Sequence, residues 1–250
     1  MISKARIKEI HSLEMRKSRR QKRLFVAEGT KLVGDLLNTM RPSYVAALPQ
    51  WIDMHRNLLA DTPVDEITPA ELERASLLRA PQEVIALFPI PDYLLDTESL
   101  KGKLTLALDG VQDPGNLGTI VRIADWFGIE GILCSMDTAD IYNPKAIQAT
   151  MGAIARVRLH YVDLPDMLSQ TSLPIYGTFL DGENLYDKQL SPEGIIVMGN
   201  EGKGITKEVG EKVSECLFIP SYPAQRETSE SLNVAIATSI VCAEFRRRQQ

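Results

Sequence analysis

A buried strand that runs into a glycine-rich turn constrains this chain more than any other feature. Residues 195–198 are all apolar, and three glycines lie within positions 199–204. Glycine lets another backbone or a ligand approach closely, and strand ends of this kind bind ligands in α/β proteins. Two common phosphate-binding motifs are absent, because Asn200 and Lys207 stand where they need lysine and glycine. Taken alone, the turn favours a plain connection between a strand and a helix.

From residue 104 onward, short apolar segments alternate with amphipathic ones. Alternation of this kind predicts a parallel sheet that is covered by helices on both faces. Asn116 and Asn143 occupy positions where helix N-caps are expected, and Ser231 is a good N-cap for the last helix. We expect strands at 104–108, 131–134, 157–162, 175–180, 194–199 and 216–220, and helices at 116–127, 144–153, 163–170, 205–213 and 231–247.

The first half of the chain reads as a separate, smaller α/β unit. Thr68, Pro69 and Glu71 have the spacing of a capping box with proline at the first helical position. Prolines and a polar run then interrupt the pattern, which indicates a linker at 91–102. We therefore expect a domain at 1–90 and a second at 103–250. The expected strands are 24–27, 44–47, 64–67 and 84–88, with helices over 1–20, from 28, over 49–59 and from 68.

Composition is that of a soluble globular protein, with 44% hydrophobic and 24% charged residues. No apolar run is long enough to span a membrane, and residues 1–10 lack a secretory h-region. Cys134, Cys216 and Cys242 are isolated in apolar contexts, which indicates reduced core residues of a cytoplasmic protein. With three histidines and neither HExxH nor CxxC, we expect no metal site.

Positive charge is concentrated at the start of the chain. Residues 1–31 carry a net charge of +7, whereas the remainder carries −12, although arginines recur at 246–248. An acidic body with a basic segment suits a protein that contacts nucleic-acid phosphates in one place. A solvated basic helix with no partner explains the same pattern equally well.

Two further segments change the interpretation of the glycine turn. One is Leu108–Arg122, which contains DGVQDPGNLGTIVR, and the other joins Ile219-Pro220 to the sequence ESLNVAIA at 230–237. Together with GNEGKGI at 199–205, they resemble the three ordered motifs of the SpoU (TrmH-like) family of RNA ribose 2′-O-methyltransferases. The resemblance implies a knotted (trefoil) parallel-sheet catalytic domain. Segments 25–29 and 81–86 resemble, more weakly, the ribosomal-L30-like substrate-binding α/β domain that often precedes it.

Arg122 is a charge in an apolar stretch, and a structural salt bridge to Asp109, Asp113 or Asp125 would account for it. The family resemblance instead makes Arg122 catalytic, in activating the ribose 2′-hydroxyl. Because arginine stays protonated, it is a poor base. Stabilisation of the developing alkoxide and binding of the adjacent phosphate is the alternative role.

The resemblance also assigns Asn116, Glu201, Ser231 and Asn233 to the catalytic site, although each also suits a helix cap or a dipole partner. It implies S-adenosyl-L-methionine as methyl donor and a homodimer. The cofactor positions that match the family are Thr178, Gly199, Ile219 and Leu232, which ordinary core packing would also explain. The loop at 221–230 departs from the family by being longer and lacking glycine; Tyr222 and Arg226 there fit either RNA contacts or a plain surface loop.

The sequence thus predicts a cytoplasmic enzyme that methylates a ribose 2′-hydroxyl in structured RNA, with ribosomal RNA favoured over transfer RNA. A non-catalytic RNA-binding protein of the same fold, a methyltransferase for an RNA base and one for a small molecule remain the alternatives.

Overall fold

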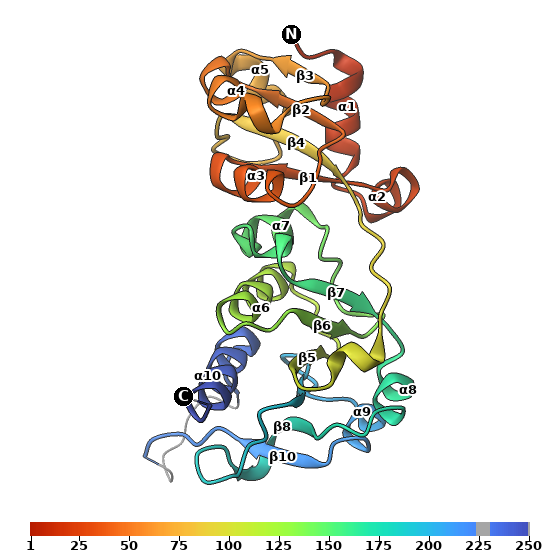
Figure 1. Ribbon diagram of the computed structural model, residues 1–250, viewed down its shortest axis with the longest axis vertical. Helices are drawn as coiled ribbons and strands as arrows, with labels where there is room; N and C mark the ends of the chain where they lie inside the picture. The colour runs from red at the N-terminus through yellow and green to blue at the C-terminus, as the bar shows by residue number, and fades with distance from the viewer. Residues whose placement is uncertain (224–230, 250) are drawn as a thin grey trace. The chain divides into compact units, whose positions relative to one another are not determined.

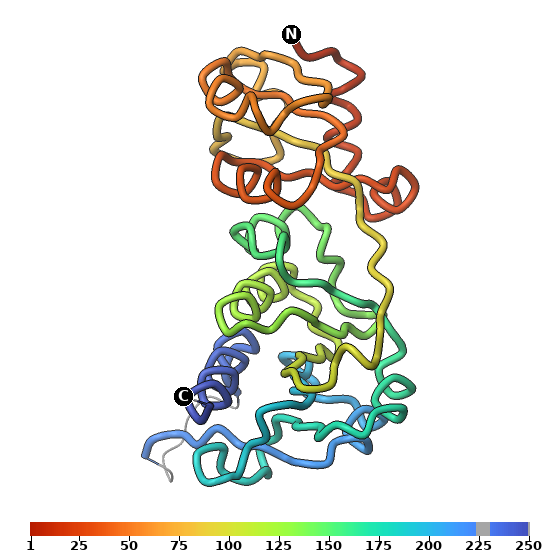
Figure 2. The backbone as a smooth tube through the Cα atoms, viewed as in Figure 1, coloured from red at the N-terminus to blue at the C-terminus, as the bar shows by residue number. Residues whose placement is uncertain are grey.

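The computed structural model describes residues 1–223 and 231–249, and the chain forms two compact units. One unit comprises residues 1–92 together with 140–155, and the other comprises 93–139 and 156–250. Figure 1 labels most of their helices and strands, and Figure 2 traces the same path as a tube. Within the described residues, no helix has the length and apolar content needed to cross a bilayer.

The first unit is built on a four-stranded sheet in the order β1-β4-β2-β3. β4 runs antiparallel to β1 and β2, while β2 and β3 are parallel. Its elements are α1 (Lys4–Ser12), α2 (Arg16–Lys22), β1 (Leu24–Glu28), α3 (Thr30–Leu37), β2 (Tyr44–Ala47), α4 (Pro49–His55), η1 (Arg56–Leu58), β3 (Val64–Glu66), α5 (Pro69–Ala75), β4 (Val84–Pro89), α7 (Pro144–Thr150) and η3 (Ala153–Ala155).

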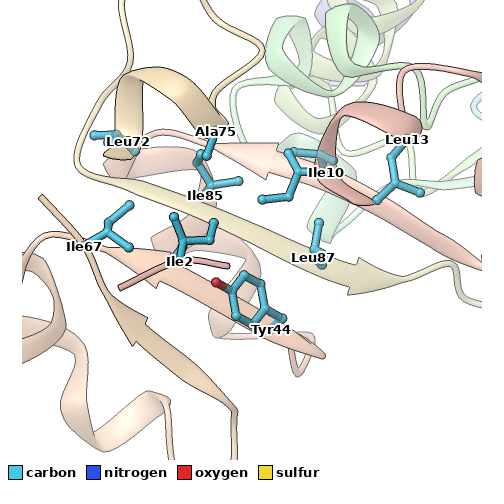
Figure 3. Close-up of a cluster of buried hydrophobic side chains, with 11 residues drawn as sticks. Ile2, Ile10, Leu13, Tyr44, Ile67, Leu72, Ala75, Ile85 and Leu87 are labelled. Carbon is cyan, nitrogen blue, oxygen red and sulfur yellow. The ribbon is translucent and has the colours of Figure 1, made fainter. Parts of the chain in front are cut away.

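Both faces of this small sheet are buried. On one face, Ile85 and Leu87 of β4 pack with Ile10 of α1 and Leu72 of α5, as Figure 3 shows. The period-two alternation of a strand sends its intervening residues to the opposite face. There Phe88 stacks on Phe25 at 5.6 Å between ring centroids.

Residues 140–155 belong to this first unit although they lie far along the chain. The Tyr142 ring lies 5.0 Å from that of Phe25, and Arg19, only 2% exposed, donates two hydrogen bonds to Asp140 Oδ2. Arg19 also donates to the carbonyls of Leu13 and Glu14, both at 2.7 Å. One of the basic residues at the start of the chain is therefore a buried structural cation.

The second unit contains a six-stranded sheet in the order β10-β8-β9-β5-β6-β7, and all of its strand pairs are parallel. This confirms the predicted parallel sheet. The elements are η2 (Thr97–Leu100), β5 (Leu104–Leu108), α6 (Pro114–Trp126), β6 (Gly131–Cys134), β7 (Arg158–Tyr161), α8 (Leu164–Ser169), β8 (Ile175–Asn184), β9 (Gly194–Met198), α9 (Lys207–Gly210), β10 (Glu215–Phe218) and α10 (Val234–Arg247).

Helices cover both faces of the six-stranded sheet. On one face, Ile195 and Val197 of β9 pack in a cluster with Met167 of α8 and Val209 of α9. On the other, α6 contacts α10, and Tyr176 of β8 meets Phe245 of α10 edge-on at 4.9 Å. The carboxyl ends of β5, β8 and β9 are therefore held by a buried core on both sides.

Two predicted helix starts are wrong, and both errors concern candidate site residues. Asp113, not Asn116, is the N-cap of α6, because Pro114 occupies the first helical position and the Asp113 side chain accepts the Asn116 N–H. Asn233, not Ser231, caps α10, since its side chain accepts from the N–H groups of Ala235 and Ile236. The Asn116 side chain is thereby released from capping.

Other differences follow from local chemistry. The predicted helix over 1–20 is two helices, α1 and α2. Cys134 and Cys242 are buried as expected, whereas Cys216 is exposed. The three arginines at 246–248 donate hydrogen bonds to backbone carbonyls and to the Glu244 carboxylate, so they do not extend the basic segment.

Candidate active site

The glycine turn after β9 is closed by its own backbone. Asn200 and Gly204 form an antiparallel bridge in which each N–H donates to the other's carbonyl at 2.9 Å. The Asn200 Oδ1 accepts from the N–H groups of Gly202 and Lys203. A Cβ atom at Gly199 would lie 2.3 Å from the carbonyl carbon of Gly204, so no side chain fits at this position. The glycine is required by close backbone approach.

Two polar side chains fix this turn to the end of β5. Asn200 Nδ2 donates to the carbonyl of Gly110 at 2.7 Å. Asp109, 3% exposed, accepts from both the N–H and the hydroxyl of Thr206, at 2.6 and 2.8 Å. A buried carboxylate needs such donors to offset its desolvation. The first and second motifs are therefore rigidly joined at neighbouring strand ends.

Three of the predicted catalytic residues meet in one hydrogen-bonded chain. Asn116 Nδ2 donates to Glu201 Oε1 at 2.7 Å, and Asn233 Nδ2 donates to Asn116 Oδ1 at 3.1 Å. Asn233 Oδ1 in turn accepts from backbone N–H groups in the first turn of α10. Each of the two side-chain amides therefore accepts a hydrogen bond on the side of α10 and donates one on the side of the Glu201 carboxylate. Successive hydrogen bonds of this kind polarise one another. The three sequence motifs thus converge on Glu201.

Arg122 lies in α6 and is exposed. Asp125 pairs with Arg156, and Asp109 accepts from Thr206, so neither forms the salt bridge suggested for Arg122. Within residues 1–223 and 231–249, no hydrogen bond or ion pair engages its guanidinium. A charged group without a structural partner is free to bind a phosphate or a developing oxyanion.

Ser231 is exposed and contributes no cap. It is not joined to the Asn116–Glu201–Asn233 chain by any hydrogen bond among the described residues.

Two of the four predicted cofactor positions, Gly199 and Ile219, directly follow strands β9 and β10, while Thr178 lies within β8 and Leu232 precedes α10. Thr178 directly follows the segment of β8 that pairs with β9, and its hydroxyl donates to Met198 Sδ at 3.9 Å, next to Gly199. Ile219 comes after β10, which pairs with β8 through a register shift between Cys216 and Leu217. Leu232 is 45% exposed and precedes Asn233. The structure therefore places Thr178 beside the residue that precedes Gly199.

The two buried cysteines are not suited to act as nucleophiles, and no metal site is found among the described residues. Burial raises the pKa of the Cys134 thiol and raises that of Cys242 to about 12, so neither is a thiolate at neutral pH. Across the described ranges, no group of His, Cys, Asp and Glu has an arrangement suited to a metal ion.

Sequence reasoning missed Asp109, Gly110 and Thr206 as site-forming residues. The available signal was position, because Asp109 follows a buried strand directly. Arg226 lies outside the described residues, whereas Tyr222 is 94% exposed.

Sequence models of two families match the chain. The SpoU rRNA Methylase family matches residues 103–243, and the MRM3-like substrate binding domain matches residues 4–86. The chain belongs to the SpoU rRNA methylase family. The SpoU match includes Arg122 and every residue of the Asn116–Glu201–Asn233 chain.

Individual relatives of this SpoU-family chain agree. The 23S rRNA (guanosine(2553)-2′-O)-methyltransferase RlmP of Bacillus subtilis is 29% identical over 255 residues, covering 96% of each protein. A TrmH-family protein from Porphyromonas gingivalis is 39% identical, with a TM-score of 0.87 and 99% of both chains covered. An AdoMet-bound rRNA methyltransferase from Sinorhizobium meliloti is 28% identical, with a TM-score of 0.88 over 100% of this chain and 97% of that one.

Proposed function

We propose that this protein transfers a methyl group from S-adenosyl-L-methionine to a ribose 2′-hydroxyl of ribosomal RNA. The observation that carries the proposal is the hydrogen-bonded chain from Asn233 through Asn116 to Glu201. It draws one residue from each of the three motifs into a single constellation. The names of the relatives, which act on 23S rRNA at guanosine 2′-oxygens, support this choice of reaction and substrate.

The proposed cofactor site fits the residues present. Thr178, Gly199, Ile219 and Leu232 are apolar, small or without a side chain, and all four retain some exposure. Backbone groups at parallel strand ends would bind the nucleoside, and Leu232 and Ile219 would pack on its adenine. When bound, S-adenosylmethionine supplies an activated methyl group on a sulfonium, which needs no metal. The trefoil knot implied by the family is part of this proposal.

In the proposed mechanism the protein aligns and stabilises the attacking oxygen. The guanidinium of Arg122, which has no ion pair or hydrogen bond among the described residues, binds the phosphate next to the target ribose. It also stabilises the negative charge that develops on the 2′-oxygen as the hydroxyl proton passes to solvent water. Glu201, held by Asn116, orients the substrate or Arg122. Ser231 and Asn233 line the same site. Positioning of this kind supplies a large part of the rate of a displacement reaction.

The basic segment supplies the proposed phosphate contacts, but only some of its cations are available. Arg19 is buried, while Arg6, Lys22 and Arg23 pair with carboxylates. The cations with no hydrogen bond or ion pair among described residues are Lys4, Lys8, Arg16, Lys17, Arg20 and Lys31. We assign RNA binding to these. We also propose that the substrate is ribosomal RNA, that the protein acts in the cytoplasm and that it forms a homodimer. Residues 1–90 would recognise the substrate, residues 91–102 would form a linker, and residues 103–250 would carry out catalysis.

Mapping of ribose methylation tests the proposal. RNA from cells with and without the protein is compared by alkaline-resistance sequencing, and purified protein is then given unmodified ribosomal RNA with radiolabelled S-adenosylmethionine. We expect one ribose methyl group to disappear from the deletion strain and to be restored in vitro. Loss of a base methyl group instead would support the base-methylating alternative, and no change in either assay would support the non-catalytic one.

A further inference from the structure

The first unit contains a cavity of about 460 Å³ that the proposed reaction does not use. This size falls within the range of small-ligand sites. The start of α3, the N-cap of α4, helix α5 and the loop before β4 meet there, and this loop belongs to segment 81–86, one of the two that resemble a substrate-binding domain. The lining residues are Thr30, Leu48, Pro69, Leu72, Glu73, Pro81, Gln82 and Glu83.

Glu83 is held in this cavity by an unusual backbone. Its φ is +36°, and the Val84 N–H donates to the Gln82 carbonyl, which makes Glu83 the centre of a γ-turn. A positive φ is uncommon for a residue with a side chain, and residues held in such conformations cluster at ligand sites. The surrounding fold secures it, since the Leu48 N–H donates to the Glu83 carbonyl at 2.8 Å.

The Glu83 carboxylate is also oriented. The Thr30 hydroxyl donates to Glu83 Oε2 at 2.8 Å, and no described residue donates to Oε1. The loop lies close to α3, because a Cβ at Gly29 would come within 3.3 Å of Gln82 Oε1. One carboxylate oxygen therefore stays available to a ligand between the α3 terminus and the loop that carries Glu83.

The lining chemistry selects for a hydrogen-bond donor with apolar faces. Ionised carboxylates only accept hydrogen bonds, so Glu73 and Glu83 favour a donor ligand and repel a phosphate. Leucine and proline side chains supply flat apolar walls. An unstacked RNA base has this combination of apolar faces and a polar edge. Guanine fits best, because its N1–H and N2–H₂ groups stand side by side and match a carboxylate, whereas uracil offers a single donor.

Three exposed cations lie near the lining in the sequence and are called the rim here: Lys31 follows Thr30, Arg74 follows Glu73, and Arg79 comes two residues before Pro81. None of the three has an ion pair or hydrogen bond within the described part of the chain. Cations at the rim would bind the phosphates on either side of an inserted base. The charges of cavity and rim are thus complementary to a nucleotide within an RNA strand.

We propose that this cavity binds an unstacked guanine of the substrate RNA, with its Watson–Crick edge on Glu83. The inference rests on the proposed RNA substrate but concerns a different site. In this proposal the Glu83 carboxylate accepts hydrogen bonds from the N1–H and N2–H₂ groups of the guanine. Thr30 positions that carboxylate, and Lys31 contacts a phosphate of the RNA backbone.

Fluorescence anisotropy with the full chain tests it. The probes are single-stranded RNAs of about 12 nucleotides, identical except that one guanine is replaced by inosine, which lacks the N2 amino group. Wild-type protein should bind the guanine probe roughly tenfold more tightly. Glu83→Gln and Thr30→Val should reduce this ratio to below about twofold. Glu14→Gln, the same change at an exposed glutamate of the same unit, should retain it.

A second measurement needs no variant. Guanosine monophosphate added to isotope-labelled wild-type protein should shift the amide resonances of Thr30, Leu48 and Glu83, and inosine monophosphate should shift them less. Equal binding of the two RNA probes, or unchanged discrimination in Glu83→Gln, would overturn the proposal. Methylation of ribosomal RNA is measured separately with labelled methyl donor. Absence of methylation by the wild-type protein would contradict the proposed reaction. Methylation without discrimination between guanine and inosine would contradict only the proposed guanine site.

Discussion

The Asn116 side chain donates a 2.7 Å hydrogen bond to Glu201, a residue 85 positions further along the chain. The contact exists because Asp113 and Pro114 begin α6 three residues earlier, which leaves the Asn116 amide free. Asn233 then donates to Asn116 from the start of α10. Asn116 is consequently the central link, and it both donates and accepts.

Replacement of Asn116 by aspartate should break this link with almost no change in shape. Two carboxylates would face each other where one amide now donates, and like charges at such a distance disfavour ionisation of both. We expect methyl transfer at neutral pH to fall at least about tenfold, with partial recovery as the pH is lowered, because a shared proton restores a donor. Asn143→Asp is the matched control, since Asn143 only accepts, as the N-cap of α7. A fully active Asn116→Asp enzyme would remove the chain from the mechanism.

Arg122→Ala should abolish methyl transfer while S-adenosylmethionine binding, measured by calorimetry, stays nearly unchanged. Because the exposed guanidinium has no partner among described residues, the free energy of unfolding should change by less than about 0.5 kcal/mol. Arg156→Ala provides the comparison, as Arg156 forms two hydrogen bonds to Asp125 and lies outside the motifs. That variant should retain activity. Wild-type rates in Arg122→Ala would contradict the assigned role.

Two glycines of one turn should respond oppositely to alanine. At Gly199 the added Cβ would lie 2.3 Å from backbone, whereas at Gly202 its nearest neighbour would be Asn200 Oδ1 at 3.7 Å. We expect Gly199→Ala to destabilise the protein by about 2 kcal/mol or more and to weaken cofactor binding. Gly202→Ala should be nearly neutral in both. Thermal unfolding with and without S-adenosylmethionine measures the difference, and equal melting temperatures would refute the close approach.

The cations of α1 and α2 should differ in their effect on RNA affinity. Lys17→Ala combined with Arg20→Ala removes two charges that have no ion pair among the described residues, so the affinity for ribosomal RNA should fall and the salt dependence should lose about two counterions. Arg6→Ala combined with Lys22→Ala removes the same net charge from residues that pair with Glu9. This control should have the smaller effect. Titrations at several salt concentrations distinguish the two pairs, and equal slopes would count against the assignment.

Glu244 should make a pH-dependent contribution to stability. Its hydrogen bonds to Arg247, and then to Arg248, lower the pKa of this carboxyl to about 2 from its ordinary value of 4.5. Because the folded pKa is the lower one, the stabilisation is complete above about pH 4.5 and is lost as the pH falls towards 2. Arg247 is 67% exposed, so screening keeps the effect below about 1 kcal/mol. Urea unfolding of wild type and Glu244→Gln should differ at neutral pH and converge in acid.

Continuous apolar runs made the parallel sheet predictable. β5 and β6 have the predicted bounds. Each is a short, mostly apolar segment that is buried over nearly its whole length, so its two ends are marked by the change to polar residues. Helix starts were less predictable, since several adjacent residues can cap. In α10 both Ser231 and Asn233 are good caps, and only the fold selects the second.

The long-range polar contacts could not be derived from spacing. Nothing in the local sequence indicates that Asn200 reaches Gly110 or that Asp109 accepts from Thr206. Two of the suggested partners of Arg122, Asp109 and Asp125, were wrong for a related reason. A carboxylate near in sequence to an arginine was already engaged elsewhere, as the Asp125–Arg156 pair shows.

The buried pair of Arg19 and Asp140 limits how this protein can be dissected. A fragment that stops after residue 92 would leave a guanidinium that is 2% exposed without its carboxylate. Uncompensated buried charge is costly enough to unfold a small domain. Truncation experiments that assign RNA recognition to the first part of the chain therefore need residues 140–155 supplied, through a circular permutation or a peptide added in trans.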